Sequence, residues 1–182
     1  MKLLGLRVLI PIAAALSGCA IQSSQTLPTQ TYAKGDSYIV LGDASRVRLS
    51  IFKGEIGNQS WHCKGLINVA NVWSANNFIV VKLHPRMGSQ DYGIGQILPD
   101  GIGGKSFVVK KGASVPIYHA HPGKVTFVGS IRIFERDNRF GILPDPAITT
   151  DDARAYLSRA YPHLPRDFAV NDLKMVPASG GC

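Results

Sequence analysis

The chain has 182 residues, of which 45% are hydrophobic, and this length suits one domain with a buried core of ordinary size. The formal net charge is +8, but the basic residues are spread along the chain and only Lys110 and Lys111 are adjacent. A dense nucleic-acid-binding patch is therefore not expected. A mildly basic surface instead favours anionic neighbours such as lipid head groups or cell-wall carboxylates.

The first 18 residues have the pattern of a secretory signal. Lys2 and Arg7 provide a positive start, residues 8–16 are almost wholly apolar, and two small residues then precede Cys19. The apolar run is far shorter than the roughly 20 residues that cross a bilayer. We therefore expect residues 1–18 to be removed on export.

Residues 16–19, with the sequence Leu-Ser-Gly-Cys, resemble the lipobox of bacterial lipoproteins. The resemblance implies that lipid is added to the sulfur of Cys19 and that the chain is cut just before it. Two or three acyl chains make a stable anchor, because each buried CH₂ contributes roughly 0.8 kcal/mol. Ala20 and Ile21 stand where lipoproteins of the inner membrane often carry Asp. The resemblance thus implies the outer membrane, with the domain facing the periplasm.

Residues 19–36 are polar and aperiodic, and they predict a flexible tether with a typical length on the order of 23 Å. At the other end, residues 177–182 are rich in small residues and predict a flexible tail. Cys63 and Cys182 form an even pair in an oxidising compartment, where disulfides persist. Two alternatives stay open: the cysteines form a disulfide, or Cys182 remains unpaired in the tail.

Most of the region 37–176 is typical of strands separated by turns. Residues 46–52 alternate between apolar and polar side chains, the pattern of a half-buried strand. Residues 78–83 are apolar on both faces, which favours a central strand. Further strands are predicted at residues 38–41, 66–73, 107–110, 115–118 and 125–134. Many short strands at close spacing predict a mainly β fold, an antiparallel β-sandwich or a partly open barrel.

One helix is predicted near the C-terminus, at about residues 150–161. Thr149 and Asp152 have the spacing of a capping box, and Asp151 and Asp152 suit the positive end of the helix dipole. Pro162 ends the pattern. With the lipobox and the strand pattern, this helix makes the chain resemble small uncharacterised envelope lipoproteins with β-sandwich domains. The resemblance implies a fold and a location and carries no catalytic residues.

His119 and His121 are the best candidates for a ligand site. Residues two apart in an extended segment project on one face, so both imidazoles could meet one metal ion, with His62 or His84 as a further ligand. The alternative is a pair of solvated or hydrogen-bonded histidines at a strand end, and no cofactor is expected. Residues 99–106 approach a phosphate-binding loop, but they lack its first glycine and precede a strand rather than a helix.

The two tryptophans and the catalytic motifs leave the activity open. Trp61 and Trp73 suit either the core or an exposed platform for a glycan or a partner protein. No G-x-S-x-G or H-E-x-x-H motif is present. The sequence thus favours a non-enzymatic interaction or structural module of the envelope, partnered by another envelope protein or a cell-wall component. The alternatives are a metal- or small-ligand-binding lipoprotein using His119 and His121, and a cell-wall-acting enzyme of unrecognised type.

Overall fold

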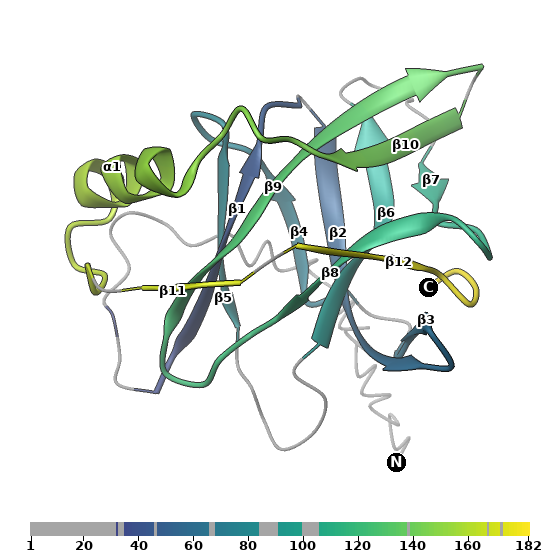
Figure 1. Cartoon of the computed structure of the whole chain (residues 1–182), viewed down its shortest axis with the longest axis horizontal. Coiled ribbons are helices and arrows are strands. Elements are labelled where there is room, and N and C mark those ends of the chain that lie inside the picture. Colours follow the sequence, from purple (N-terminus) through teal and green to yellow (C-terminus); the bar gives the residue numbers. More distant parts are fainter. Residues whose placement is uncertain are drawn as a thin grey trace, which may run out of the picture.

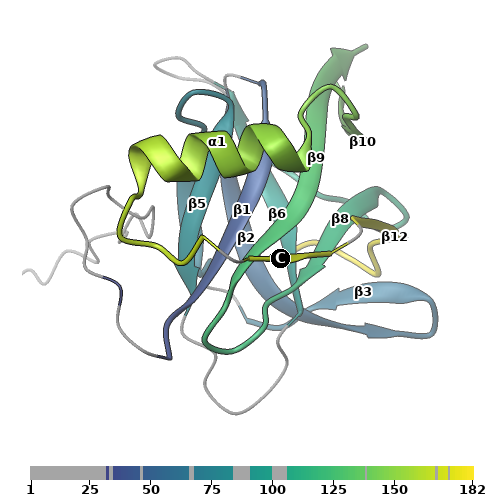
Figure 2. The ribbon, with the colours of Figure 1, turned by 60° about the vertical axis from the view of Figure 1, so that its left-hand side comes forward.

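The computed structural model describes residues 32, 35–45, 47–65, 68–83, 91–99, 106–137, 139–166, 168–171 and 173–182. The predicted signal peptide, Cys19 and most of the predicted tether lie outside these residues. In the described part, two β-sheets pack face to face and one helix covers the outer face of the first sheet (Figures 1 and 2). This arrangement confirms the predicted fold class, mainly β with one C-terminal helix.

The first sheet has the strand order β10-β9-β1-β5, and β11 adds to β9. β1 and β9 run parallel, although the sequence predicted an antiparallel sandwich. The pairs β1–β5 and β9–β10 are antiparallel, as expected. The strands span Ser37–Asp43 (β1), Phe78–Leu83 (β5), Val125–Arg136 (β9), Arg139–Pro144 (β10) and Ala169–Val170 (β11).

The prediction that residues 78–83 form a central strand is wrong, because β5 lies at the edge of its sheet. Its two faces are nevertheless both covered. Ile79 and Val81 belong to the core between the sheets, whereas Phe78 stacks on Tyr156 of the helix with ring centroids 4.6 Å apart. An edge strand with a helix on one side and a sheet on the other needs apolar residues on both faces, just as a central strand does.

The second sheet has the order β12-β8-β6-β2-β3, with β4 also paired to β2 and β7 to β6. Its strands span Val47–Gly57 (β2), Ser60–Cys63 (β3), Ala70–Trp73 (β4), Asp91–Pro99 (β6), Phe107–Val108 (β7), Ser114–His119 (β8) and Lys174–Pro177 (β12). The sequence pattern located β2 and β8 well but gave β4 and β7 as longer strands, and it missed β3, β6, β10, β11 and β12.

The second sheet curls until its two end strands meet. Trp61 of β3 forms an isolated parallel bridge with Ala178, which directly follows β12, and the amide of Ser179 donates to the carbonyl of Trp61 (2.9 Å). The structure joins Cys63 and Cys182 as a disulfide, with Cα atoms 5.6 Å apart. The closed half-barrel encloses a small core of its own around the fully buried Trp61.

Residues 177–182 are therefore not the flexible tail that their small side chains predicted. Pro177 still belongs to β12, Ala178 is 2% exposed, and its amide donates to the carbonyl of Ala113 (2.8 Å). The disulfide at Cys182 fixes the end of the segment. A glycine suits position 181 because a Cβ there would lie 3.0 Å from Val108 Cγ1, a contact that composition alone does not reveal.

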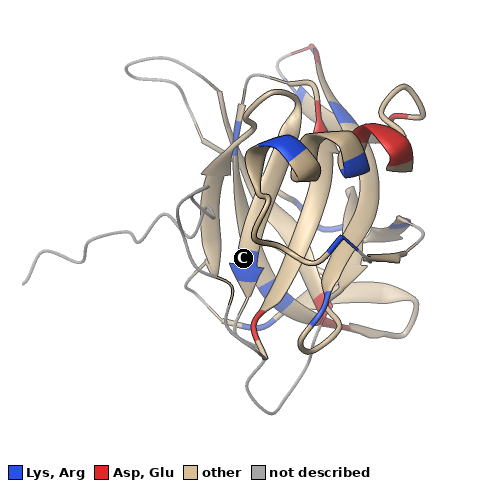
Figure 3. Cartoon of the chain, turned by 90° about the vertical axis from the view of Figure 1, so that its left-hand side faces the viewer, with Lys and Arg blue, Asp and Glu red and all other residues tan. Residues whose placement is uncertain are grey.

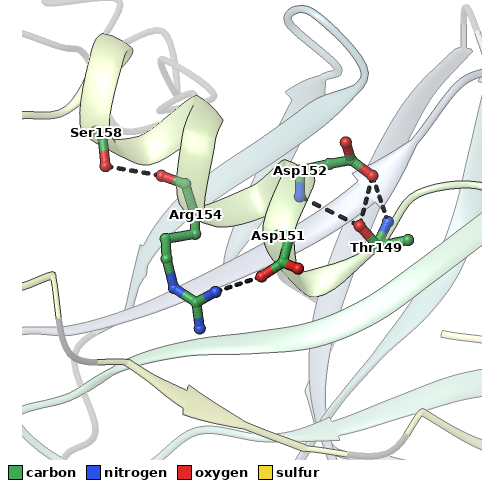
Figure 4. Close-up of polar contacts among 5 residues, drawn as sticks. All are labelled: Thr149, Asp151, Asp152, Arg154 and Ser158. Atoms are coloured by element: carbon green, nitrogen blue, oxygen red, sulfur yellow. Dashed lines mark hydrogen bonds and ion pairs between the residues drawn. The ribbon is translucent and has the colours of Figure 1, made fainter.

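The helix α1 (Thr150–Ala160) begins where the capping box predicted. The amide of Thr149 donates to Asp152 Oδ2 (2.8 Å), and the amide of Asp152 donates to Thr149 Oγ1 (3.2 Å) (Figure 4). Acidic residues lie in its first turn and basic residues follow (Figure 3). Its apolar face covers β5, β1 and β9 through Ala153, Tyr156 and Leu157. Among the described residues, no helix is long and apolar enough to span a membrane.

Candidate functional site

An open groove with a volume of about 320 Å³ lies at the end of β8. Its apolar side is formed by Ile56 of β2 and Ile117 of β8, and its polar side chains come from three different chain segments. We call this hollow the histidine groove; its polar lining consists of Asp91, His119, His121, Asn171 and Lys174. Its volume lies at the lower end of the range found for small-molecule sites.

His119 projects into the groove because it follows Ile117 by two residues along β8. Asp91 is its cross-strand partner on β6, and His119 Nδ1 lies 2.8 Å from Asp91 Oδ1. This hydrogen bond orients the imidazole and leaves its Nε2 directed elsewhere. The His119 side chain is 48% exposed, so a ligand in the groove can reach it.

His121 is held by the segment between β11 and β12. Its Nε2 lies 3.3 Å from the side-chain amide of Asn171, and Asn171 Nδ2 also donates to the backbone carbonyl of His119 (3.0 Å). The rings of His119 and His121 therefore face each other edge to face, with centroids 5.3 Å apart. The sequence predicted that the two imidazoles lie on the same side of the strand end, and in the structure they are in contact there.

Lys174 supplies a positive charge to the groove. It is the first residue of β12, paired in register with Ile117, and it is exposed. No described residue forms an ion pair with it, in contrast to Lys64 and Lys82, which pair with Glu55 and Asp36. The groove thus combines one unpaired ammonium, two oriented imidazoles, the Asp91 carboxylate bonded to His119, and an apolar side. The ammonium and the imidazoles can meet a small anion that carries an apolar group.

Metal binding has less support among the described residues. They include no group of three or more His, Cys, Asp and Glu side chains placed to hold a metal ion. His62, one candidate for a third ligand, bonds through Nε2 to the carbonyl of Gly57 (3.1 Å) on the β2–β3 hairpin. The other candidate, His84, lies outside the described residues, as do residues 100–105 of the loop that approaches a phosphate-binding motif.

The two tryptophans do not form a shared platform. Trp61 is fully buried, and Trp73 is half-buried with the Arg48 guanidinium 5.6 Å from its ring centroid. They pair with opposite ends of β2, at Ile56 and Arg48. The sequence left open whether the tryptophans lie in the core or form an exposed platform, and the structure places Trp61 in the core. Cys63 is engaged in the disulfide.

One buried acid lies away from the groove. Asp43, at the end of β1, is fully buried, and its Oδ1 accepts hydrogen bonds from the amide and hydroxyl of Ser45. Its Oδ2 has no hydrogen-bond partner in the described structure. Burial raises the pKa of this carboxyl, and the Ser45 hydrogen bonds offset part of that rise. The carboxyl sits between the sheets, away from the surface, so we place no ligand there.

Several groove residues were missed by the sequence analysis. Asp91, Asn171 and Lys174 come from segments 28 to 55 residues distant from His119 along the chain, and they meet only through the pairing of β6, β8 and β12. The single signal available was His119 and His121 at a strand end. A comparison with known proteins matched no family model, no curated protein and no solved structure.

Proposed function

We propose that this chain is a lipid-anchored, non-enzymatic binding module of the bacterial cell envelope. The proposed anchor is Cys19, and the proposed place is the periplasmic side of the outer membrane. These proposals rest on the lipobox-like residues 16–19 and on Ala20 and Ile21 after the cysteine. A disulfide between Cys63 and Cys182 agrees with an oxidising compartment.

The observation that carries the binding role is the histidine groove. It brings Lys174, His119 and His121 around one apolar-sided hollow of about 320 Å³. The ligand that fits this chemistry is a small molecule with one carboxylate and a short apolar group, such as the free carboxyl end of a short peptide. The carboxylate would accept hydrogen bonds from Lys174 and an imidazole, and the apolar group would lie on Ile56 and Ile117.

A binding role is favoured over hydrolysis by the partners within the groove. The described lining contains no serine, threonine or cysteine that His119 could activate as a nucleophile. Asn171 holds the His121 ring and also donates to the backbone carbonyl of His119, while Asp91 holds the His119 ring, so both imidazoles are fixed in place. Such pre-organised donors serve recognition, because they need not be ordered again when the ligand binds.

The test is calorimetric titration of the lipidated protein in nanodiscs with acetyl-Ala-Ala carrying a free carboxylate. The same dipeptide with an amidated end is the control ligand. Lys174→Ala should weaken binding of the free acid about tenfold or more, since a charge-assisted hydrogen bond contributes about 1.5–3 kcal/mol. The amide should bind weakly to both proteins. His62→Ala, a histidine outside the groove, should bind like wild type.

A metal-binding role is the competing proposal, and the same protein tests it. Titration with Zn²⁺ and Cu²⁺ would reveal it as binding that is lost in the double variant His119→Ala, His121→Ala and kept in His62→Ala. Binding of neither the dipeptide nor a metal would refute the proposed role of the groove. The anchor is tested separately, because Cys19→Ser should release the protein from the membrane fraction without affecting either titration.

A further inference from the structure

The outer face of the β9–β10 hairpin carries a dense group of arginines and exposed apolar side chains. In the antiparallel register, Arg132 pairs with Leu143, Phe134 with Gly141, and Arg136 with Arg139. Cross-strand partners share a face, and alternate residues of each strand return to it. Phe134 and Leu143 are 40% and 45% exposed, although large apolar side chains are usually buried. We call this set of six residues the arginine face.

The opposite face of the hairpin is anchored to the core, so the arginine face is part of a well-packed structure. Ile131 and Ile142 are buried in the core between the sheets, and Ile133 packs against it. Phe140 contacts Phe107 of β7, with ring centroids 4.4 Å apart. The ring of Phe134 lies directly over Gly141, where an added Cβ would lie 2.2 Å from its Cζ. The hairpin therefore presents a firm surface although it extends beyond the body (Figure 1).

The positive charge of this face is not neutralised within the described structure. Arg132 and Arg139 form no ion pair with any described residue, and Arg136 lies 3.7 Å from Asp137 with both side chains more than four-fifths exposed. Such a solvated pair contributes little. The acids of the first turn of α1 are engaged elsewhere, since Asp151 pairs with Arg154 and Asp152 bonds Thr149.

β10 is also the last strand of its sheet. In the described chain, β10 pairs with β9 alone. The backbone groups of Arg139–Pro144 form no described backbone hydrogen bond other than those to β9. An edge of this kind exposes amide and carbonyl groups that can pair with another extended chain. Arg139 and Pro144, at the two ends of β10, are residues of the kind that protect such edges against self-pairing, and β10 also approaches β8 of the second sheet.

We propose that the arginine face and the adjoining edge of β10 bind an extended acidic segment of another protein, which adds to the sheet as a strand beside β10. The side chains of that strand opposite Arg139 and opposite Leu143 would be carboxylates, the second of them facing Arg132 across β10. The side chain between them would be apolar and would lie against Phe134 and Leu143. Bidentate pairing with a guanidinium suits Asp and Glu, and backbone pairing supplies the remaining contacts.

A protein strand fits this surface better than a membrane or a second copy of the chain. β1 and β9 are parallel, so the chain enters β1 at Ser37 at one end of the sheet while the hairpin tip extends beyond the other end. The point where the proposed tether enters the domain thus lies at the end of the sheet opposite the hairpin tip. Pairing of two β10 edges would gather six arginines on one face, which like-charge repulsion disfavours.

The probe is a peptide with acetylated and amidated ends, Thr-Glu-Val-Leu-Val-Glu-Thr, in which the two Glu and the Leu share one face of a strand. Binding to the full chain is measured at low salt by calorimetry and by amide chemical shifts. The expected result is saturable binding with shifted and more slowly exchanging amides in β10. The double variant Arg132→Glu, Arg139→Glu should weaken binding about tenfold or more. The matched control Lys111→Glu, Arg159→Glu should keep wild-type affinity, because both residues are exposed and lie outside the hairpin.

Three further results would overturn the proposal. The first is that a peptide with Gln in place of both Glu binds as tightly as the acidic peptide, which would show that charge does not contribute to binding. The second is that a peptide with N-methylated backbone amides binds as tightly as the unmodified peptide, which would show that it does not pair with β10 as a strand. The third is that wild type binds anionic phosphatidylglycerol vesicles and not the peptide, or forms a dimer through β10 without it. Because Lys174 lies outside the arginine face, Lys174→Ala should leave peptide binding unchanged, so failure here is separable from failure of the groove.

Discussion

Removal of the Cys63–Cys182 disulfide should destabilise this protein strongly. The bridge links residues separated by 119 positions, so it constrains most of the domain in the unfolded state. The chain-entropy relation for a loop of this length gives about 5 kcal/mol. This is a large share of the roughly 5–15 kcal/mol by which domains are stable. For a domain of this size it corresponds to a fall in Tm of roughly 10–20 °C.

The structure also predicts where the loss becomes visible. Trp61 is fully buried in the half-barrel that the disulfide closes, and Cys63 and Cys182 both pack against that small core. Without the bridge, the segment after β12 keeps its described backbone hydrogen bonds to Trp61, Gly112 and Ala113. We therefore expect the end of the chain to open locally before the two main sheets separate.

The assay is urea and thermal unfolding of Cys63→Ser, Cys182→Ser in a Cys19→Ser background, followed by far-ultraviolet circular dichroism and tryptophan fluorescence. The double serine variant and the reduced parent protein should show the same large shift. The tryptophan emission should move to longer wavelength below the global transition. A loss of less than about 1 kcal/mol would refute the closure argument, because the unfolded state would then gain little freedom when the bridge is cut.

Three smaller predictions concern single residues. Gly54→Ala would place a Cβ 2.1 Å from a buried indole nitrogen and should cost about 3 kcal/mol in chemical denaturation, whereas Gly180→Ala, with nothing within 4 Å, should be close to neutral. Burial raises the pKa of Asp43 in the folded chain, so stability is lost as the pH rises through that raised pKa. Asp43→Asn should therefore have a larger free energy of unfolding than wild type at neutral pH. This difference should shrink as the pH falls toward the ordinary pKa of an aspartate, and a difference independent of pH would contradict the reasoning. Thr149→Ala removes the helix cap and should cost about 1 kcal/mol in urea unfolding, while Ser158→Ala on the exposed helix surface should cost less.

The sequence determined the features that depend on neighbouring residues. The start of α1 follows from Thr149 and Asp152 three positions apart, and both hydrogen bonds of the box are present. The alternation in residues 46–52 located β2, whose Leu49 and Ile51 lie in the core between the sheets. The expected half-buried strand is wrong there, because Ser50 and Phe52 on the other face are buried as well. His119 and His121 could be paired from sequence, since residues two apart in an extended chain lie on one side.

The tertiary structure decided everything that depends on distant residues. β6 escaped detection because glycines interrupt its pattern, and those glycines are explained only by their neighbours: a Cβ at Gly93 would meet Ile117 and Trp61, and one at Gly95 would meet Cys182. The edge position of β5, the ordered end of the chain, the groove around Lys174 and the arginine face likewise arise from strand order. Local patterns record which side chains are buried, whereas strand order sets which segments meet, and that order is fixed by packing of the whole core.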